Sequence, residues 1–286
     1  MPCRARVAAG NTGDVGWLVA ERRVCPPLQP FVHAMQGYVE RSPDWLARRE
    51  LPAPQCVVIL DLGAPIEVFA EGPDAAPTRF PGGFVAGLDD RFTLTRYRGE
   101  QRGIQLNLTP IGTRLLFGVP MCELTRRVIG VSELWPGERS IGDELRDLPS
   151  WDARFDRLEA RLCQRLRHAS AHTRMMAWAF ARVLETGGRV PAADVANTLG
   201  YSHKHTIDLF HEHIGMTPKA LARLVRFDRL TSALRRSPPR PWADLAIELG
   251  FTDQAHLARE VRRFSGLTPS ALRTVLGAPS QPESPG

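Results

Sequence analysis

The C-terminal third of the chain contains the same sequence pattern twice. Residues 194–202, DVANTLGYS, recur fifty positions later as residues 244–252, DLAIELGFT. A second block, GMTPKAL at 215–221, recurs as GLTPSAL at 266–272. Two blocks that recur in the same order are far harder to obtain by accident than one. The sequence therefore predicts two copies of one structural unit.

Each copy is predicted to form two short helices joined by a tight turn. Gly200 and Gly250 suit the left-handed backbone conformation that ends a helix and redirects the chain. Ser202 in the first copy, and Thr252 or Asp253 in the second, supply the side-chain oxygen that caps the next helix. A helix, a glycine-containing turn and a second helix form the helix-turn-helix arrangement.

The sequence predicts seven helices in this part of the chain, over residues 172–186, 191–199, 203–214, 218–236, 241–249, 253–265 and 269–276. Thr217-Pro218 and Thr268-Pro269 each place a capping hydroxyl before a proline at the first helical position. The long helix over 218–236 is predicted to hold the two units apart, by about 34 Å if both enter successive major grooves of DNA. The alternative interpretation is a plain helical bundle whose repeats stack only for stability.

Positive charge is concentrated in the same part of the chain. Residues 168–286 carry 15 Lys and Arg against 10 Asp and Glu, whereas residues 1–167 carry 22 against 21. Arginine supplies 13 of those 15 cations, and its guanidinium fork suits phosphates and guanine edges. The charge balance favours a nucleic-acid partner but is weak evidence when taken alone.

Histidine and cysteine usage argues against metal and cofactor chemistry. Two H-x-H pairs, His203/His205 and His211/His213, lie on one predicted helix, where residues two apart point about 200° apart and do not chelate one ion. The five cysteines are scattered and none forms a C-x-x-C pair, which fits a reducing compartment better than a disulfide scaffold or a zinc ribbon. We therefore expect a cytoplasmic protein that does not span a membrane, with no catalytic residues, metal or cofactor.

The second copy carries a longer signature. It runs from Trp242-Ala243-Asp244-Leu245-Ala246 through Leu249-Gly250-Phe251 to Leu257, Phe264, Gly266 and Thr268-Pro269. With these residues, the stretch 172–276 resembles the DNA-binding domain of the AraC/XylS family of transcriptional regulators. The resemblance implies two helix-turn-helix units that bind double-stranded promoter or operator DNA. It also implies regulation of transcription, usually activation through contact with RNA polymerase.

The resemblance further implies which side chains of the second unit face the bases. Aligned with the family, the expected base-facing residues are Gln254, Ala255, Ala258 and Arg259. Glutamine pairs with adenine and arginine with guanine, and an alanine methyl group meets the thymine methyl. The alternative is that Gln254 and Arg259 are simply solvated surface residues.

The first unit departs from the family pattern. The family's base-facing positions correspond to Lys204, Ile207 and Asp208, and Thr206 stands where the family usually keeps a buried leucine. Either the helix is rotated so that Ile207 turns inward, or this unit reads DNA weakly. An aspartate repels phosphate, although it can accept a hydrogen bond from cytosine N4. The contacts expected from this unit come from Ser202, His203, Lys204 and Asp208.

The N-terminal half has a β-rich pattern after an irregular, proline-containing stretch over residues 1–50. The candidate strands are residues 56–60, 66–70, 84–86, 92–97 and 103–108. A helix is expected from Thr109-Pro110 to Phe117, and another, capped by Ser150, over 151–166. The apolar stripe of the second helix is either core packing or a dimer seam. Short strands separated by glycine and proline are typical of a small barrel or sandwich, which is compatible with the cupin-like domain common in the family.

The expected fold class is α+β: a β-rich domain with flanking helices, a cupin-like barrel or sandwich, followed by an all-α, seven-helix domain with two helix-turn-helix motifs. We expect an effector-binding or dimerisation domain over 1–167, a DNA-binding domain over 168–276 and a disordered tail over 277–286. The expected function is sequence-specific transcription regulation, with a small-molecule effector or a homodimer as further partners. Two rivals stay open: an N-terminal protein-interaction module, and a cysteine-dependent catalytic domain using Cys56 or Cys122.

Overall fold

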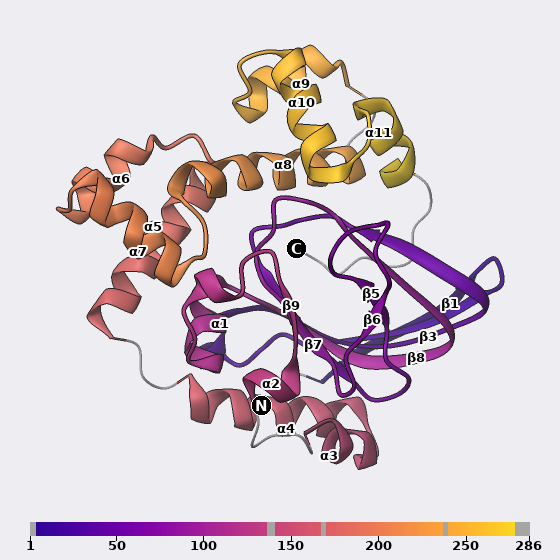
Figure 1. Ribbon diagram of the computed structural model, residues 1–286. Helices are drawn as coiled ribbons and strands as arrows, with labels where there is room; N and C mark the ends of the chain where they lie inside the picture. Colours follow the sequence, from indigo (N-terminus) through magenta and orange to yellow (C-terminus); the bar gives the residue numbers. More distant parts are fainter. Residues whose placement is uncertain (1–3, 136–140, 167–169, 237–239, 278–286) are drawn as a thin grey trace.

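The computed structural model describes residues 4–135, 141–166, 170–236 and 240–277 (Figure 1). Within these residues, an N-terminal antiparallel sheet with flanking helices precedes an all-helical part. The α+β fold class expected from the sequence is confirmed. Among the described residues, no helix is long and apolar enough to cross a membrane.

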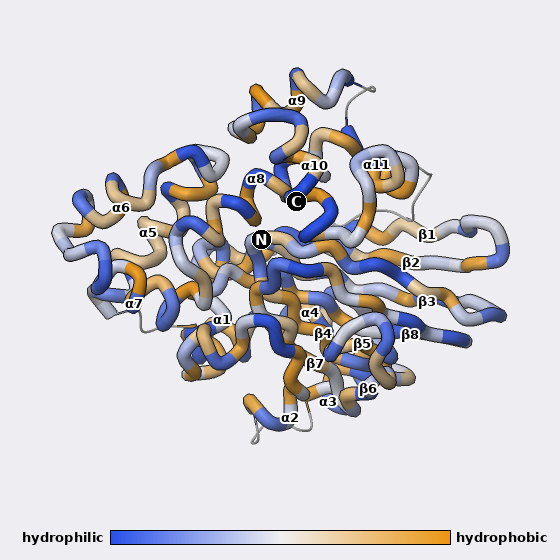
Figure 2. The backbone as a smooth tube through the Cα atoms, turned by 45° about the horizontal axis from the view of Figure 1, so that its top comes forward, coloured by the Kyte–Doolittle hydropathy of each residue, from blue (hydrophilic) through white to orange (hydrophobic). Residues whose placement is uncertain are grey.

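The described N-terminal residues form one nine-stranded antiparallel sheet. Its strands are β1 (Arg6–Thr12), β2 (Val15–Glu21), β3 (Val32–Glu50), β4 (Cys56–Asp61), β5 (Glu67–Phe69), β6 (Thr78–Arg79), β7 (Phe84–Ala86), β8 (Thr93–Leu108) and β9 (Val128–Gly130). Along the main path their order is β1-β2-β3-β8-β4-β7-β9, and β5 pairs with both β6 and β8. The long strands β3 and β8 pair along most of their length and form the middle of the sheet, where Figure 2 shows them side by side.

The first fifty residues are not irregular, which corrects the expectation from the sequence. They contain β1, β2 and β3. β1 forms one edge of the sheet and is exposed along most of its length, so no apolar alternation marks it in the sequence. Pro43 lies inside the register shift between Ser42 and Leu46, where a missing backbone N–H does not interrupt the ladder. β8 is likewise one strand where the pattern predicts two.

Short helices surround the sheet. They are α1 (Pro110–Phe117), α2 (Val131–Leu134), α3 (Ile141–Asp147) and α4 (Trp151–Arg165), with 3-10 turns η1 (Pro26–Leu28) and η2 (Met121–Glu123). The expected caps are present: the Thr109 hydroxyl accepts a hydrogen bond from the Gly112 N–H, and the Ser150 hydroxyl accepts one from Ala153. Figure 1 shows α3 and α4 on the side of the sheet away from the last helices of the chain.

The apolar stripe of α4 belongs to the core of this chain. Phe155, Leu158 and Leu162 are completely buried and join the main hydrophobic cluster with residues from the sheet. The Trp151 ring lies so close to Gly37 in β3 that a Cβ atom at that glycine would come within 2.3 Å of it. The structure therefore favours core packing over a dimer seam.

The all-helical part contains the seven expected helices. They are α5 (Ala171–Glu185), α6 (Ala192–Leu199), α7 (His203–His213), α8 (Pro218–Arg236), α9 (Trp242–Leu249), α10 (Gln254–Ser265) and α11 (Pro269–Gly277). Each observed end lies within one residue of the predicted one. Figures 1 and 2 both show α8 running between the group α5–α7 and the group α9–α11, as expected of a strut.

The predicted boundary between the two domains stays a prediction. Residues 167–169, where it falls, lie outside the described residues, as do residues 278–286 of the expected tail. The main hydrophobic cluster is continuous from the sheet into the C-terminal helices, from Ala20 in β2 to Leu272 in α11. The two parts are therefore packed against each other.

Candidate DNA interface

The first repeat folds into two helices joined by a left-handed glycine turn. α6 ends at Leu199, and Gly200 follows with a φ of +73°, a conformation in which a Cβ atom is strained. The Ser202 hydroxyl then accepts a hydrogen bond from the His205 N–H and starts α7. These local interactions produce the turn that the sequence pattern predicts.

The second repeat has the same geometry. α9 ends at Leu249, and Gly250 follows with a φ of +80°. Of the two capping residues left open by the sequence, Asp253 caps α10, because its carboxylate accepts a hydrogen bond of 2.6 Å from the His256 N–H. The Thr252 N–H instead donates to Nδ1 of the His256 ring. The second unit therefore repeats the glycine turn and the capped helix of the first, with one extra residue between the glycine and the cap.

In the first unit, the predicted contact residues lie on the outer face of α7. The side chains of Ser202, His203, Lys204 and Asp208 are all exposed. Thr206 is 1% exposed, so it occupies the buried position where the family usually has leucine. Its hydroxyl donates a 3.0 Å hydrogen bond to the Ser202 carbonyl oxygen, which satisfies the buried polar group. Ile207 is only half-buried, so the helix is not rotated to bring it inward.

In the second unit, the predicted contact residues cluster in the first half of α10. Gln254, Ala255 and Arg259 are exposed and Ala258 is half-buried. The opposite face of α10 is buried in the core through Leu257, Val261 and Phe264. The structure therefore brings these four residues together on the outer side of the helix, while their contact with bases stays a prediction.

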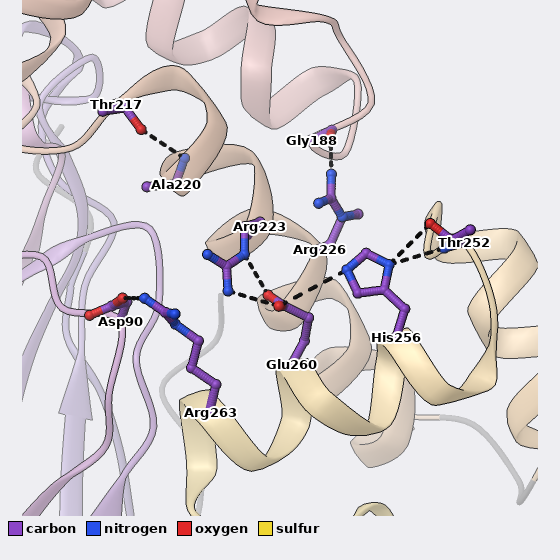
Figure 3. Close-up of polar contacts among 10 residues, drawn as sticks. All are labelled: Asp90, Gly188, Thr217, Ala220, Arg223, Arg226, Thr252, His256, Glu260 and Arg263. Carbon is purple, nitrogen blue, oxygen red and sulfur yellow. Dashed lines mark hydrogen bonds and ion pairs between the residues drawn. The ribbon is translucent and has the colours of Figure 1, made fainter.

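An ion pair that the sequence analysis missed fixes α10 on the strut (Figure 3). Glu260 is 7% exposed, and its carboxylate accepts two hydrogen bonds of 2.7 Å from the Arg223 guanidinium in α8. Such a forked pair sets the direction as well as the distance of the contact. The two residues are 37 positions apart, so no local pattern in the sequence joins them.

Two further contacts secure the same region of α8. The stacked rings of Phe227 and Phe264 have centroids 4.8 Å apart, which packs α10 against α8. The Arg226 guanidinium donates a 2.6 Å hydrogen bond to the Gly188 carbonyl oxygen, just before α6 (Figure 3). Arg223 and Arg226 therefore hold the helices together rather than facing a nucleic acid.

The N-terminal part holds both units at equivalent turns. The turn after α7 contains Gly215, whose carbonyl oxygen accepts a 2.9 Å hydrogen bond from the Thr125 hydroxyl. The corresponding turn contains Gly266, and the residue before it, Ser265 at the end of α10, accepts a 2.8 Å hydrogen bond on its carbonyl oxygen from the Arg49 guanidinium. Arg49 also lies 3.8 Å from the centre of the Phe92 ring. Residues of the N-terminal part thus contact the end of each unit's second helix, α7 and α10.

Charge reinforces the second of these contacts. Asp90 pairs with Arg263 at the end of α10 (Figure 3). Its carboxylate also pairs with Arg126 over 2.8 Å. Burial alone would raise the pKa of Asp90, but the hydrogen bonds from both arginines outweigh it and hold the pKa below its usual value. The ion pair is therefore formed at neutral pH.

The described residues offer no metal centre of three or more His, Cys, Asp or Glu side chains. Cys56, one of the two nucleophiles considered from the sequence, is completely buried in β4. Burial raises the pKa of its thiol to about 12, so it is protonated at neutral pH. Cys122 is exposed in η2. The structure supplies no activated nucleophile at Cys56.

Comparisons with known proteins give a family match at the C-terminus. A family model described as a helix-turn-helix domain matches residues 195–274, and a search of curated proteins found no match. Among solved structures, ToxT from Vibrio cholerae O395 is 9% identical and aligns with 93% of this chain and all of its own, with a TM-score of 0.47. The C-terminal domain of AraT, a response regulator from Geobacillus stearothermophilus, is 16% identical and aligns with 37% of this chain and 88% of its own, with a TM-score of 0.34. An AraC-type transcriptional regulator from Chromobacterium violaceum is 19% identical over 36% of this chain and 91% of its own, with a TM-score of 0.33.

Proposed function

We propose that the chain is a DNA-binding transcription regulator that activates genes by placing α7 and α10 in successive major grooves of one promoter. The helix-turn-helix family model that matches residues 195–274 supports DNA binding. The observation that carries this proposal is the pair of equivalent units fixed on one strut. Each unit has a left-handed glycine turn, a capped recognition helix and an exposed outer face. A rigid spacing of two such helices suits two half-sites one helical turn apart.

The second unit supplies most of the base readout in this proposal. Arg259 forms a bidentate pair with guanine, Gln254 pairs with adenine, and Ala255 and Ala258 contact thymine methyl groups. The exposure of these residues on the first half of α10 supports the assignment. A bidentate pair contributes roughly 1–3 kcal/mol of discrimination between bases.

The first unit mainly positions the protein on the backbone. Ser202, His203 and Lys204 are exposed around the N-terminus of α7, where the helix dipole favours phosphate. Asp208 lies about one turn further along, and the only base group it suits is a donor such as cytosine N4. Sequence preference is therefore expected to be weaker in the half-site that this unit contacts.

The experiment selects genomic fragments bound by the full-length protein and then compares Arg259→Ala with Lys204→Ala on the best site and on a scrambled duplex. Arg259→Ala is expected to flatten the preference for the site. Lys204→Ala is expected to weaken binding to both duplexes alike and to lower the salt slope by about 1. Arg182→Ala, an exposed change on α5, is the matched control and should bind as the unchanged protein does. Equal affinity of the unchanged protein for site and scrambled duplex contradicts the proposal.

For the N-terminal half we propose a sensor that binds a small molecule and changes how the two units are held. A pocket supports this assignment, because it is lined by residues from both parts, among them Pro30, His33, Ala177, Phe180 and Leu184. Its lining is mainly apolar, its volume is about 130 Å³, and burial lowers the pKa of His33. Because ordinary ligand pockets span roughly 300–1,000 Å³, the effector proposed for it is a very small, mostly apolar molecule. A small molecule that raises the melting temperature of the protein would support the sensor. If no small molecule does so and a partner protein binds the N-terminal half, the rival interaction module is favoured.

RNA polymerase is the protein partner proposed for activation in the cytoplasm. Ile247 is the contact residue proposed on this chain, because it is 77% exposed on α9, the helix next to α10. Loss of transcriptional activation with unchanged DNA affinity in Ile247→Ala would support the assignment, and unchanged activation would contradict it.

A further inference from the structure

Two cysteines that lie far apart in the sequence come together in the N-terminal part. The Sγ atoms of Cys25, just before η1, and Cys163, in the last turn of α4, are 3.6 Å apart although 138 positions separate them. Both residues are half-buried and reduced. We propose that this pair is a redox-active site that a hydroperoxide oxidises to a reversible disulfide.

Contacts other than the sulfurs already hold the two segments together. The Cys25 N–H donates a 2.9 Å hydrogen bond to the Glu159 carboxylate, one turn before Cys163. Arg22 pairs with Asp156 over 2.6 Å and with Glu159 over 2.8 Å, and its side chain is 2% exposed. These bonds fix the chain before η1 against α4, so the thiols stay close without a covalent link.

Closing the bond requires only a small movement. A disulfide joins two sulfurs at about 2.05 Å, so the two Sγ atoms must approach by roughly 1.5 Å. Rotation about the Cα–Cβ bonds of two half-buried side chains supplies a movement of this size. A second cysteine within reach also protects the first from further oxidation, because it resolves the sulfenic acid into a disulfide.

The reaction balances with the hydroperoxide as the sole oxidant. One thiolate attacks the peroxide oxygen, the O–O bond breaks, and the products are a sulfenic acid and water or an alcohol. The second thiol then attacks the sulfenic sulfur, which forms the S–S bond, and the sulfenic oxygen leaves as water after it takes the proton of that thiol. Two electrons pass from the thiols to the peroxide. A dithiol reductant reverses the step by thiol–disulfide exchange.

The position of the site gives the oxidised form a structural consequence. Cys163 lies at the end of α4, directly before the stretch that leads to α5, and Cys25 precedes η1 and the pocket residue Pro30. A bond between them locks the end of α4 to the chain that lines this pocket. Because the link joins distant parts of the sequence, it also restricts the unfolded chain and should raise the melting temperature of the oxidised protein.

The test treats the reduced full-length protein with hydrogen peroxide, alkylates the remaining thiols and maps the tryptic peptides. The proposal predicts the loss of two alkylatable thiols and a linked pair made of residues 24–41 and 162–165, both restored by dithiothreitol. Cys25→Ser and Cys163→Ser should each abolish this pair and the rise in melting temperature. Cys122→Ser, at an exposed cysteine outside the pair, is the matched control and should keep both.

Several outcomes would overturn the proposal. Full alkylation of Cys25 and Cys163 after peroxide treatment would show that the pair does not react. A predominant link from either residue to Cys3 or Cys122 would show that proximity in the fold does not direct the chemistry. The same mixture of links in urea-unfolded protein as in folded protein would lead to the same conclusion.

Discussion

The ion pair between Glu260 and Arg223 gives the sharpest prediction about the DNA interface. Glu260→Ala removes the acceptor of two 2.7 Å hydrogen bonds and leaves the guanidinium of Arg223, whose side chain is 23% exposed, without its partner. Breaking a fully buried pair costs about 3–5 kcal/mol. Because Arg223 retains some contact with water, we expect a loss of about 2 kcal/mol in the free energy of unfolding.

The assay is a double-mutant cycle of Glu260→Ala, Arg223→Ala and the double variant, followed by urea unfolding and by DNA affinity. The cycle should give a coupling free energy of about 1–2 kcal/mol. DNA affinity should also fall, although Glu260 faces the protein, because α10 loses its orientation on α8. Glu248→Ala breaks the exposed pair with Arg240 in the same domain and should change stability by less than about 0.5 kcal/mol. Additive effects in the cycle, or an equal loss in Glu248→Ala, would refute the reasoning.

Two other carboxylates give independent predictions. Asp61 is 2% exposed and burial raises its pKa to about 7, so the folded state binds its proton more tightly and stability falls as pH rises from about 4 to about 7. Asp61→Asn should remove this pH dependence and raise the free energy of unfolding at about pH 8 by as much as about 4 kcal/mol. The measurement is urea unfolding across this pH range, and a steeper pH dependence of stability in the variant would contradict the assignment. Asp90→Ala frees Arg263 and should speed hydrogen exchange around Gly266 while changing global stability by less than about 1 kcal/mol; unchanged exchange there would show that the contact does not hold α10.

The helical part could be predicted closely because its signals are local. A left-handed glycine, a capping hydroxyl and an apolar repeat all act within a few residues, and Gly200 and Gly250 mark the same turn twice. The copy-to-copy comparison removes most of the remaining ambiguity. This is why every helix end from α5 to α11 lies within one residue of its prediction.

The N-terminal sheet could be predicted only in part, because its stability comes from pairing between distant residues. β1 is an exposed edge strand, so its residues show no apolar alternation that would predict a strand. Pro43 argues against a strand in the sequence, but in β3 it lies in a register shift where no ladder hydrogen bond is lost. Thr206, which stands where the family usually keeps a buried leucine, shows a related limit of prediction from sequence. The sequence left a rotated helix open, whereas the structure satisfies the buried hydroxyl through a bond to the backbone of Ser202.

The contacts that orient the candidate interface could not be predicted from the sequence either, because they also join residues that are far apart in the chain. Arg223 and Arg226 look like surface cations of an amphipathic helix, yet each is committed to a partner inside the protein. Asp90 and Arg263 are 173 positions apart. Only the fold shows which arginines are engaged in this way and which, like Arg259, remain on the outer face of a recognition helix.

Hydroxyl-radical footprinting of the full-length protein on its selected genomic site tests the central claim most directly. Two recognition helices held apart by α8 should protect two windows on one face of the duplex, with centres about 10 base pairs apart. Arg259→Ala should weaken the window of the second unit before that of the first. A single protected window, or two windows on opposite faces of the duplex, would contradict the account.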